Sequence, residues 1–123
     1  MHIKEAISKG TFVIDGAMGT AVQSIDTDID RDYLGRENCT DILSKSRPEL
    51  VEQIHTSFLE VGVDAVETNT FGANKLVLSE FDAEAATWAY ELNVTSAVIA
   101  RKACEQFSDD RYVLGSMGPG TKL

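Results

Sequence analysis

The sequence of 123 residues has few cysteines, few basic residues and no long hydrophobic run. Its two cysteines, Cys39 and Cys104, form no CxxC pattern, so neither a disulfide framework nor a Cys-rich metal motif is indicated. We interpret both as reduced thiols that serve packing. No apolar run could span a bilayer, and no apolar stretch follows a basic start at the N-terminus. We therefore expect no membrane association and a cytoplasmic location.

Basic residues are outnumbered by acidic ones, eleven against twenty, which leaves a formal net charge of −9. Because the basic residues do not cluster, this charge would repel a nucleic-acid backbone, and we expect no nucleic-acid partner. The patterns GxGxxG, GxxxxGK[ST] and GxSxG are also missing. Dinucleotide, P-loop and nucleophile-elbow chemistry therefore have no support.

Three short apolar runs each end in small or polar residues, and each is predicted to be a buried strand. They are residues 12–14, residues 63–66 and residues 112–114. The polar stretch 23–47 predicts a long loop, in which a helical turn is possible. The three runs lie about 50 residues apart, so helical crossovers can join them as parallel neighbours.

Two helices are predicted between these strands. Pro48 suits the first turn of a helix that Gly62 ends, and Asp82 is a suitable N-cap for a helix over residues 83–107. His55 lies beside the apolar stripe of the first helix and is interpreted as a packing residue whose nitrogens are satisfied. The order β, α, β, α, β predicts the α/β class, with the three strand ends converging on one site.

Small and acidic residues follow the first strand, in the order Asp15, Gly16, Ala17, Met18. A carboxylate beside close-approaching backbone N–H groups suits a zwitterion that has one ammonium and one carboxylate. The same pattern is compatible with a purely structural turn in which Asp15 caps nearby N–H groups.

Four polar side chains close the second strand: Glu67, Thr68, Asn69 and Thr70. A buried strand tolerates this polarity only if the groups are paired or face a ligand, and we favour a ligand. The alternative is that Glu67 pairs with a basic residue while the threonines cap the next turn. Ser116, in the glycine-rich turn after the third strand, is the remaining candidate, although that turn could equally be structural.

Several of these segments together resemble the homocysteine S-methyltransferase family. The matching segments, in the family's order, are DGAMGT at 15–20, SRPEL at 46–50, IH at 54–55, GVDAVETNTFGAN at 62–74 and GSMGPG at 115–120. Within the family, residues 37–43 and 118–123 look most like the homocysteine domain of the cobalamin-dependent methionine synthases. Betaine-dependent and S-methylmethionine-dependent members share much of the motif set, so the methyl donor stays open.

The resemblance implies a (β/α)8 TIM barrel that binds homocysteine and holds zinc through three cysteine thiolates. Zinc would lower the thiol pKa of homocysteine and present a thiolate to an activated methyl group. Neither Cys39 nor Cys104 matches a zinc-ligand position, so we expect no zinc site in this chain. The resemblance assigns Asp15 to the homocysteine ammonium, the backbone of Gly16, Ala17 and Met18 to its carboxylate, and Glu67, Thr68, Asn69 and Ser116 to the pocket lining.

A (β/α)8 barrel takes about 250 residues. We therefore expect residues 1–123 to be the first part of such a domain, with about three strands and two helices, cut after the third strand and inactive alone. One alternative is a self-standing α/β binding or assembly module that self-associates through exposed strand edges. Another is an artificially cut segment with no activity.

Overall fold

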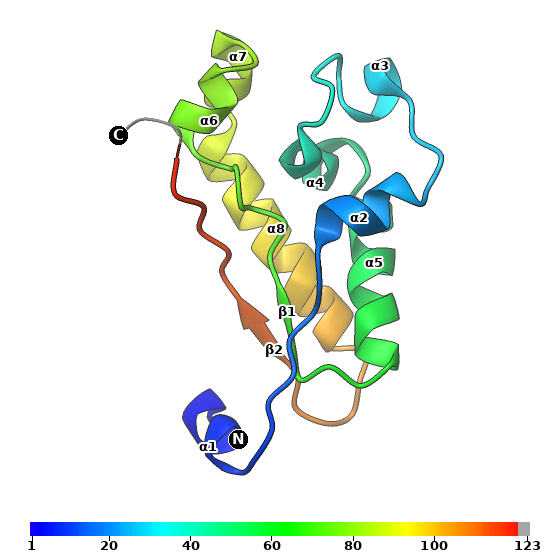
Figure 1. The fold of residues 1–123 in the computed structure, drawn as a ribbon, viewed down its shortest axis with the longest axis vertical. Helices are drawn as coiled ribbons and strands as arrows, with labels where there is room; N and C mark the ends of the chain where they lie inside the picture. Colours follow the sequence, from blue (N-terminus) through cyan, green and yellow to red (C-terminus); the bar gives the residue numbers. More distant parts are fainter. Residues whose placement is uncertain (121–123) are drawn as a thin grey trace.

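The computed structural model describes residues 1–120, in which two parallel strands lie against a pair of long helices (Figure 1). The strands are β1 (Ala65–Glu67) and β2 (Tyr112–Leu114). The helices are α1 (Ile3–Ser8), α2 (Met18–Gln23), α3 (Ile29–Asp32), the 3-10 helix η1 (Thr40–Ile42), α4 (Leu43–Ser46), α5 (Pro48–Glu60), α6 (Lys75–Ser79), α7 (Ala83–Ala86) and α8 (Ala89–Cys104). No helix among these is both long and apolar enough to cross a membrane.

The two strands pair in parallel, with Val66 opposite Val113, as the long crossover between them requires. The expected third strand, residues 12–14, is not confirmed as a full strand: within residues 1–120 this run forms a single parallel bridge, from Ile14 to Ala65. The ladder stops there because the N–H of Val13 donates to the side-chain carboxylate of Asp64, at 2.8 Å, in place of a strand carbonyl. The mixed α/β class is confirmed with two strands and one bridge.

Helix α5 begins at Pro48, as the sequence predicts, because proline is tolerated where the first N–H has no helical partner. Its apolar stripe, including Leu50, Ile54 and Leu59, is buried. Gly62 follows the helix with φ of +101°, a conformation that L side chains rarely adopt. Helix α5 packs on α8, and both lie on the same side of the strands (Figure 1).

The helix predicted over residues 83–107 is interrupted. Asp82 caps it as expected, since its carboxylate accepts the N–H of Ala85 at 2.8 Å. The next turn is of the 3-10 type, because the N–H groups of Thr87 and Trp88 donate to carbonyls three residues back instead of four. Helix α8 starts after Trp88 and ends at Cys104.

The stretch 23–47 carries more helix than its composition suggests, namely the end of α2 together with α3, η1 and α4. Asp28 caps α3 by accepting the N–H of Arg31 at 2.7 Å. The Asp32 side chain is fully buried and accepts hydrogen bonds from Arg31 and Arg47. A buried carboxylate paired with two partly exposed arginines therefore fixes this segment to the start of α5, and hydrophobic periodicity gives no sign of it.

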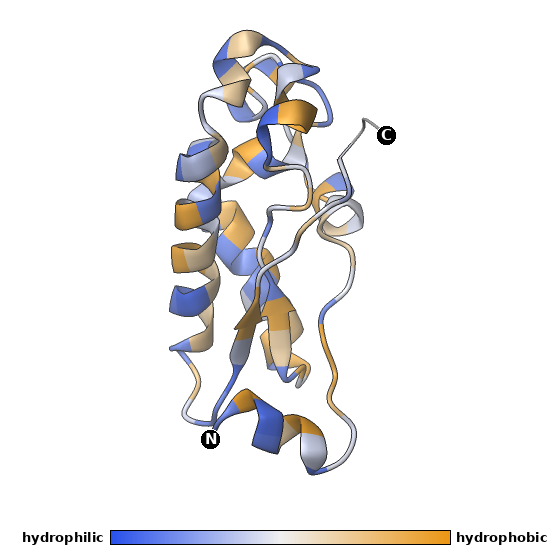
Figure 2. Cartoon of the chain, turned by 90° about the vertical axis from the view of Figure 1, so that its left-hand side faces the viewer, coloured by the Kyte–Doolittle hydropathy of each residue, from blue (hydrophilic) through white to orange (hydrophobic). Residues whose placement is uncertain are grey.

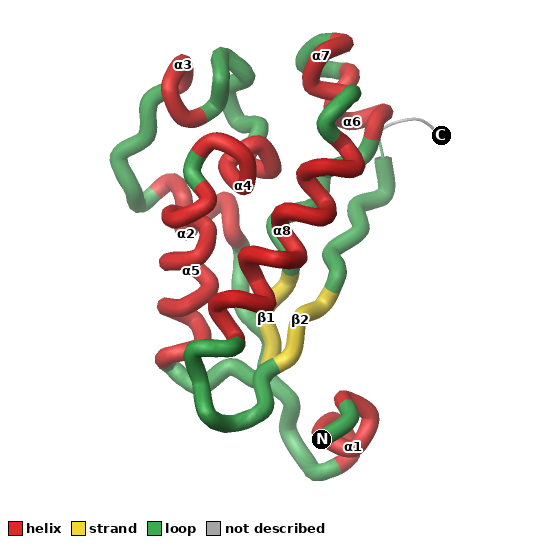
Figure 3. Tube along the Cα trace, turned by 180° about the vertical axis from the view of Figure 1, so that it is seen from behind, coloured by secondary structure: helices red, strands yellow, loops and turns green. Residues whose placement is uncertain are grey.

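The elements divide between the two ends of the strands. Helix α1 lies beyond the start of both strands, and the remaining short helices lie toward the strands' C-terminal ends (Figures 1 and 3). Tyr112 ties α1 in place by donating its hydroxyl to the carbonyl of Met1 at 2.9 Å. Figure 2 shows hydrophobic residues on the strands and more polar segments after them. The polar strand ends therefore face the short helices.

Candidate functional site

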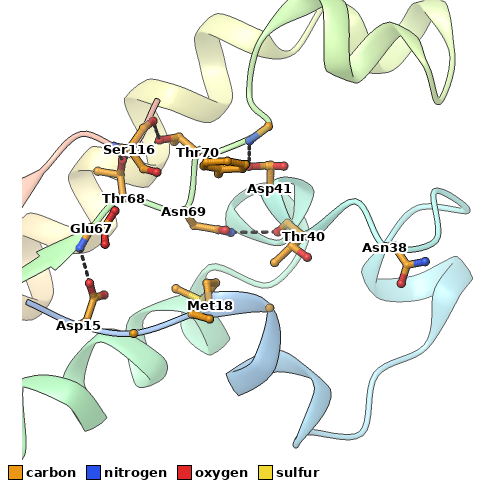
Figure 4. Close-up of a pocket in the computed structure, with 15 residues that line it drawn as sticks. Asp15, Met18, Asn38, Thr40, Asp41, Glu67, Thr68, Asn69, Thr70 and Ser116 are labelled. Atoms are coloured by element: carbon orange, nitrogen blue, oxygen red, sulfur yellow. Dashed lines mark hydrogen bonds between the residues drawn. The ribbon is translucent and has the colours of Figure 1, made fainter. Parts of the chain in front are cut away.

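A pocket of about 630 Å³ lies at the C-terminal ends of the strands (Figure 4). The structure brings all eight residues singled out in the sequence to this one pocket, from three separate segments of the chain. The pocket is lined by Asp15, Gly16, Ala17, Met18, Gly19, Asn38, Thr40, Asp41, Glu67, Thr68, Asn69, Thr70, Phe71, Gly72 and Ser116.

Asp15 and Glu67 place two carboxylates on the wall of the pocket. The N–H of Glu67 donates to Oδ1 of Asp15 at 3.0 Å, which holds the turn after residue 14 beside the end of β1. Burial raises the pKa of Asp15 to about 6, and the nearby negative charge of Glu67 adds to the rise. Among residues 1–120, no salt bridge reaches either carboxylate. The alternative that Glu67 pairs with a basic residue therefore has no partner in this part of the chain.

Gly16, Ala17 and Met18 lead from Asp15 into α2. Ala17 is the N-cap of this helix, and its methyl side chain cannot accept a hydrogen bond. The first N–H groups of α2 therefore have no side-chain acceptor. These groups line the pocket beside Asp15 and are suitable donors for an anionic group.

Three of the polar residues that follow β1 are buried and bond within the protein. Asn69 is buried, and its amide nitrogen donates to the carbonyl of Thr40 at 2.9 Å and to Oγ of Ser44 at 3.4 Å. Thr68 and Thr70 are also buried and bond to each other and to the Ser116 backbone. Both threonines thus serve the protein's own hydrogen bonding.

Three residues of the 23–47 stretch, Asn38, Thr40 and Asp41, also line the pocket but were not predicted as site residues. Asn38 has φ of +68°, which turns the chain toward η1. Asp41 accepts the N–H of Gly72 at 3.1 Å, and burial raises the pKa of its carboxyl. Residues 37–43 carry part of the family resemblance, but no local pattern marked these three as pocket residues, because only the packing of η1 against the loop after β1 brings them to the site.

Asp41→Asn is expected to leave stability at pH 7 unchanged or slightly higher. A carboxyl whose pKa rises on folding favours the protonated fold, so stability falls as pH rises through that pKa, and a neutral amide avoids this loss. Asparagine can still accept the N–H of Gly72. Asp41→Ala cannot, and we expect it to lose about 1 kcal/mol. Chemical denaturation of both variants at pH 5 and pH 7 checks this, and a strongly destabilised Asp41→Asn would contradict it.

The two cysteines do not fit the zinc site that the family resemblance implies. Cys39 and Cys104 are both buried and belong to separate hydrophobic clusters. Burial raises the pKa of the Cys39 thiol to about 11 and also raises that of Cys104, whereas zinc binds thiolates. Within residues 1–120, no group of three His, Cys, Asp or Glu residues is arranged to hold a metal ion.

His55 differs from its predicted role as a packing residue with satisfied nitrogens. It is fully buried on α5 as expected, but neither Nδ1 nor Nε2 has a hydrogen-bond partner among residues 1–120. Burial accordingly lowers the pKa of His55 to about 4, so the ring is neutral at pH 7. It does not line the pocket.

The sequence over residues 12–123 matches the family model for homocysteine S-methyltransferase. The chain belongs to this family. The match includes every pocket-lining residue described above, and it confirms the resemblance drawn from the motifs at the strand ends.

Two methionine synthases are similar to this homocysteine S-methyltransferase family member. The protein from Mycobacterium tuberculosis is 44% identical over 122 residues, and that from Mycobacterium leprae is 43% identical over 122 residues. Each alignment covers 97% of the chain but only 10% of the relative. The chain therefore spans about a tenth of the length of the methionine synthases it matches.

Solved structures of the homocysteine methyltransferase MmuM from Escherichia coli share the fold. The oxidized form gives a TM-score of 0.72 and the metallated form 0.64, both at 22% identity. The oxidized-form match covers 95% of this chain and 40% of that structure. At this identity the comparison supports the fold alone.

Proposed function

We propose that residues 1–123 supply the first part of a homocysteine-binding barrel in a methyltransferase of the methionine synthase type. In this proposal the intact protein transfers a methyl group to the thiol of homocysteine, and this chain contributes amino-acid contacts only. The 43–44% identity to methionine synthases, over nearly the whole chain, supports this type of methyltransferase.

The observation that carries the proposal is the Asp15 carboxylate. It lines the pocket, is partly desolvated, and has no cationic partner in the described part of the chain. A ligand ammonium would supply the missing positive charge and restore the pKa of Asp15 toward its ordinary range. Glu67, on the same wall, adds to the attraction for a cation.

The backbone of Gly16, Ala17 and Met18 complements this carboxylate. This segment follows Asp15 and leads into α2, whose N-cap Ala17 makes no side-chain capping bond, and its N–H groups could receive the carboxylate of the same amino acid. An acidic side chain beside free N–H donors suits a zwitterion better than it suits a simple cation or a simple anion. The homocysteine thiol would then extend away from this polar pair.

The remaining parts of the proposal depend on residues beyond those of this chain. We propose that the bridge at Ile14 becomes a full strand when further barrel strands are present. The zinc that would activate the thiol needs ligands from elsewhere in the barrel, since Cys39 and Cys104 do not fit, and cobalamin would be held by other regions of a full-length parent. A cytoplasmic location stays a prediction.

Isothermal titration of homocysteine tests the proposal, using this chain and a version extended to the length of the whole barrel, each with and without zinc. We expect measurable binding by the extended version only. Stoichiometric, zinc-independent binding by the short chain would contradict the expected incompleteness. A concentration-dependent dimer of the short chain that binds no zinc would favour the self-standing module, and absence of binding by both would overturn the proposed substrate.

A further inference from the structure

Three hydrogen bonds join the ends of β1 and β2 into a closed ring beside the pocket (Figure 4). The backbone N–H of Ser116 donates to Oγ1 of Thr68 at 3.0 Å. The hydroxyl oxygens of Thr68 and Thr70 lie 2.7 Å apart. Oγ1 of Thr70 bonds to the carbonyl oxygen of Ser116 at 2.8 Å, which closes the ring.

The chemistry of these groups fixes the direction of every bond in the ring. A carbonyl oxygen can only accept, so Thr70 must donate its single hydroxyl hydrogen to Ser116. Thr70 then has no hydrogen left for Thr68, and Thr68 must donate to Thr70. Both hydroxyl hydrogens are therefore committed within the protein, and each hydroxyl retains only acceptor capacity toward a ligand.

The surroundings of the ring make it difficult for water to replace these bonds. Thr68 is 7% exposed and Thr70 is 5% exposed. The two loops also approach closely at Gly118, where any side chain would collide with the carbonyl of Phe71. A glycine is therefore required for the loop after β2 to lie against the loop after β1.

We propose that Thr70 is a positioning residue of the pocket, which holds the Ser116 loop against the end of β1 through Thr68 and contributes no hydrogen bond donor to the ligand. The identity of the ligand rests on the proposed function, whereas the positioning of the Ser116 loop does not. It also limits the role of Thr68, which cannot donate to a ligand carboxylate while the ring is closed.

Hydrogen exchange of the Ser116 amide, followed by NMR on the full chain, tests the ring without any ligand. Thr70→Val keeps the size of the side chain and removes the hydroxyl, and we expect Ser116 to exchange about tenfold faster. Thr70→Ser restores the hydroxyl and should return exchange to within about threefold of the unmodified chain. Thr56→Val, the same change on α5 outside the ring, is the matched control. Unchanged exchange in Thr70→Val, or equally fast exchange in Thr70→Ser, would overturn the proposal.

A binding comparison then separates positioning from direct contact. Thr68→Val is titrated with homocysteine and with 3-aminopropane-1-thiol, which lacks the carboxylate, in the barrel-length protein. Positioning predicts that both ligands weaken by the same factor. Weakening of homocysteine alone would mean that Thr68 donates to the carboxylate, which overturns the proposal. If the unmodified protein binds neither ligand, the proposed function fails, and the Ser116 exchange still decides the positioning role.

Discussion

Asp15→Asn is expected to weaken homocysteine binding at pH 7 by about 30-fold or more, while leaving the fold as stable as before or more so. Removing one member of a buried, hydrogen-bonded charge pair costs about 2–5 kcal/mol of binding free energy. Asparagine can still accept the N–H of Glu67, so the local structure should persist. Titration of the variant with homocysteine tests the affinity, and thermal melting tests the stability. Both use the chain length that binds homocysteine.

The pKa of Asp15 gives this prediction a pH dependence. Its carboxyl titrates near pH 6 in the fold, against an ordinary value of 3.8, so the protonated fold is favoured and stability falls as pH rises from about 4 to about 6. Pairing with an ammonium needs the ionised carboxylate, and homocysteine affinity should therefore rise between pH 5 and pH 7. Asp15→Asn should show no such rise in affinity and a smaller fall in stability, because the raised pKa of Asp41 still contributes. Asp26→Asn, at an exposed site after α2, is the matched control and should behave as the unmodified chain does.

The largest expected effect on stability is that of Asp32→Ala, a loss of about 2–3 kcal/mol in the free energy of unfolding. The buried carboxylate accepts hydrogen bonds from Arg31, Arg47 and the N–H of Asp28. Its removal breaks all of these bonds, although the exposed parts of the two arginine side chains can bond to water. The melting temperature should fall by roughly 10–20 °C. Asp30→Ala, an exposed position in the same helix, should change the free energy by less than about 0.5 kcal/mol.

The pH dependence of stability distinguishes the ion-pair role of Asp32 from simple packing. Hydrogen bonds from Arg31, followed by one from Asp28 and one from Arg47, hold the pKa of Asp32 well below its ordinary value of 3.8. The stabilisation is therefore fully present above about pH 4 and is lost as pH falls further. The difference between the unmodified chain and Asp32→Ala should shrink in that range. A constant difference down to pH 2 would contradict the ion-pair explanation.

The consequence for the pocket is indirect. The Asp32 ion pair fixes the stretch between α2 and α5, and this stretch supplies Asn38, Thr40 and Asp41 to the pocket wall. We therefore expect Asp32→Ala to weaken ligand binding as well, in proportion to the loss of folded protein. Its binding curve should recover at lower temperature, whereas that of Asp15→Asn should not.

Sequence patterns predicted an element correctly wherever the interaction that forms it lies within one short segment. The cap at Asp82, the helix start at Pro48 and the strand at residues 112–114 depend on residues close in sequence, and the structure confirms each. The eight candidate site residues follow apolar runs, and the structure places them around one pocket. Their contact with homocysteine stays a prediction.

The remaining features depend on hydrogen bonds between segments far apart in the sequence. The run at residues 12–14 forms one bridge because the Asp64 side chain takes the N–H of Val13, and the commitment of both threonine hydrogens depends on the Ser116 loop, 46 residues beyond Thr70. By itself, the sequence determined the α/β class, the family and the residues at the strand ends, since these follow from periodicity and local motifs. Only the tertiary structure decided which polar groups remain free for a ligand, because a hydrogen bond between distant segments leaves no periodic trace in the chain.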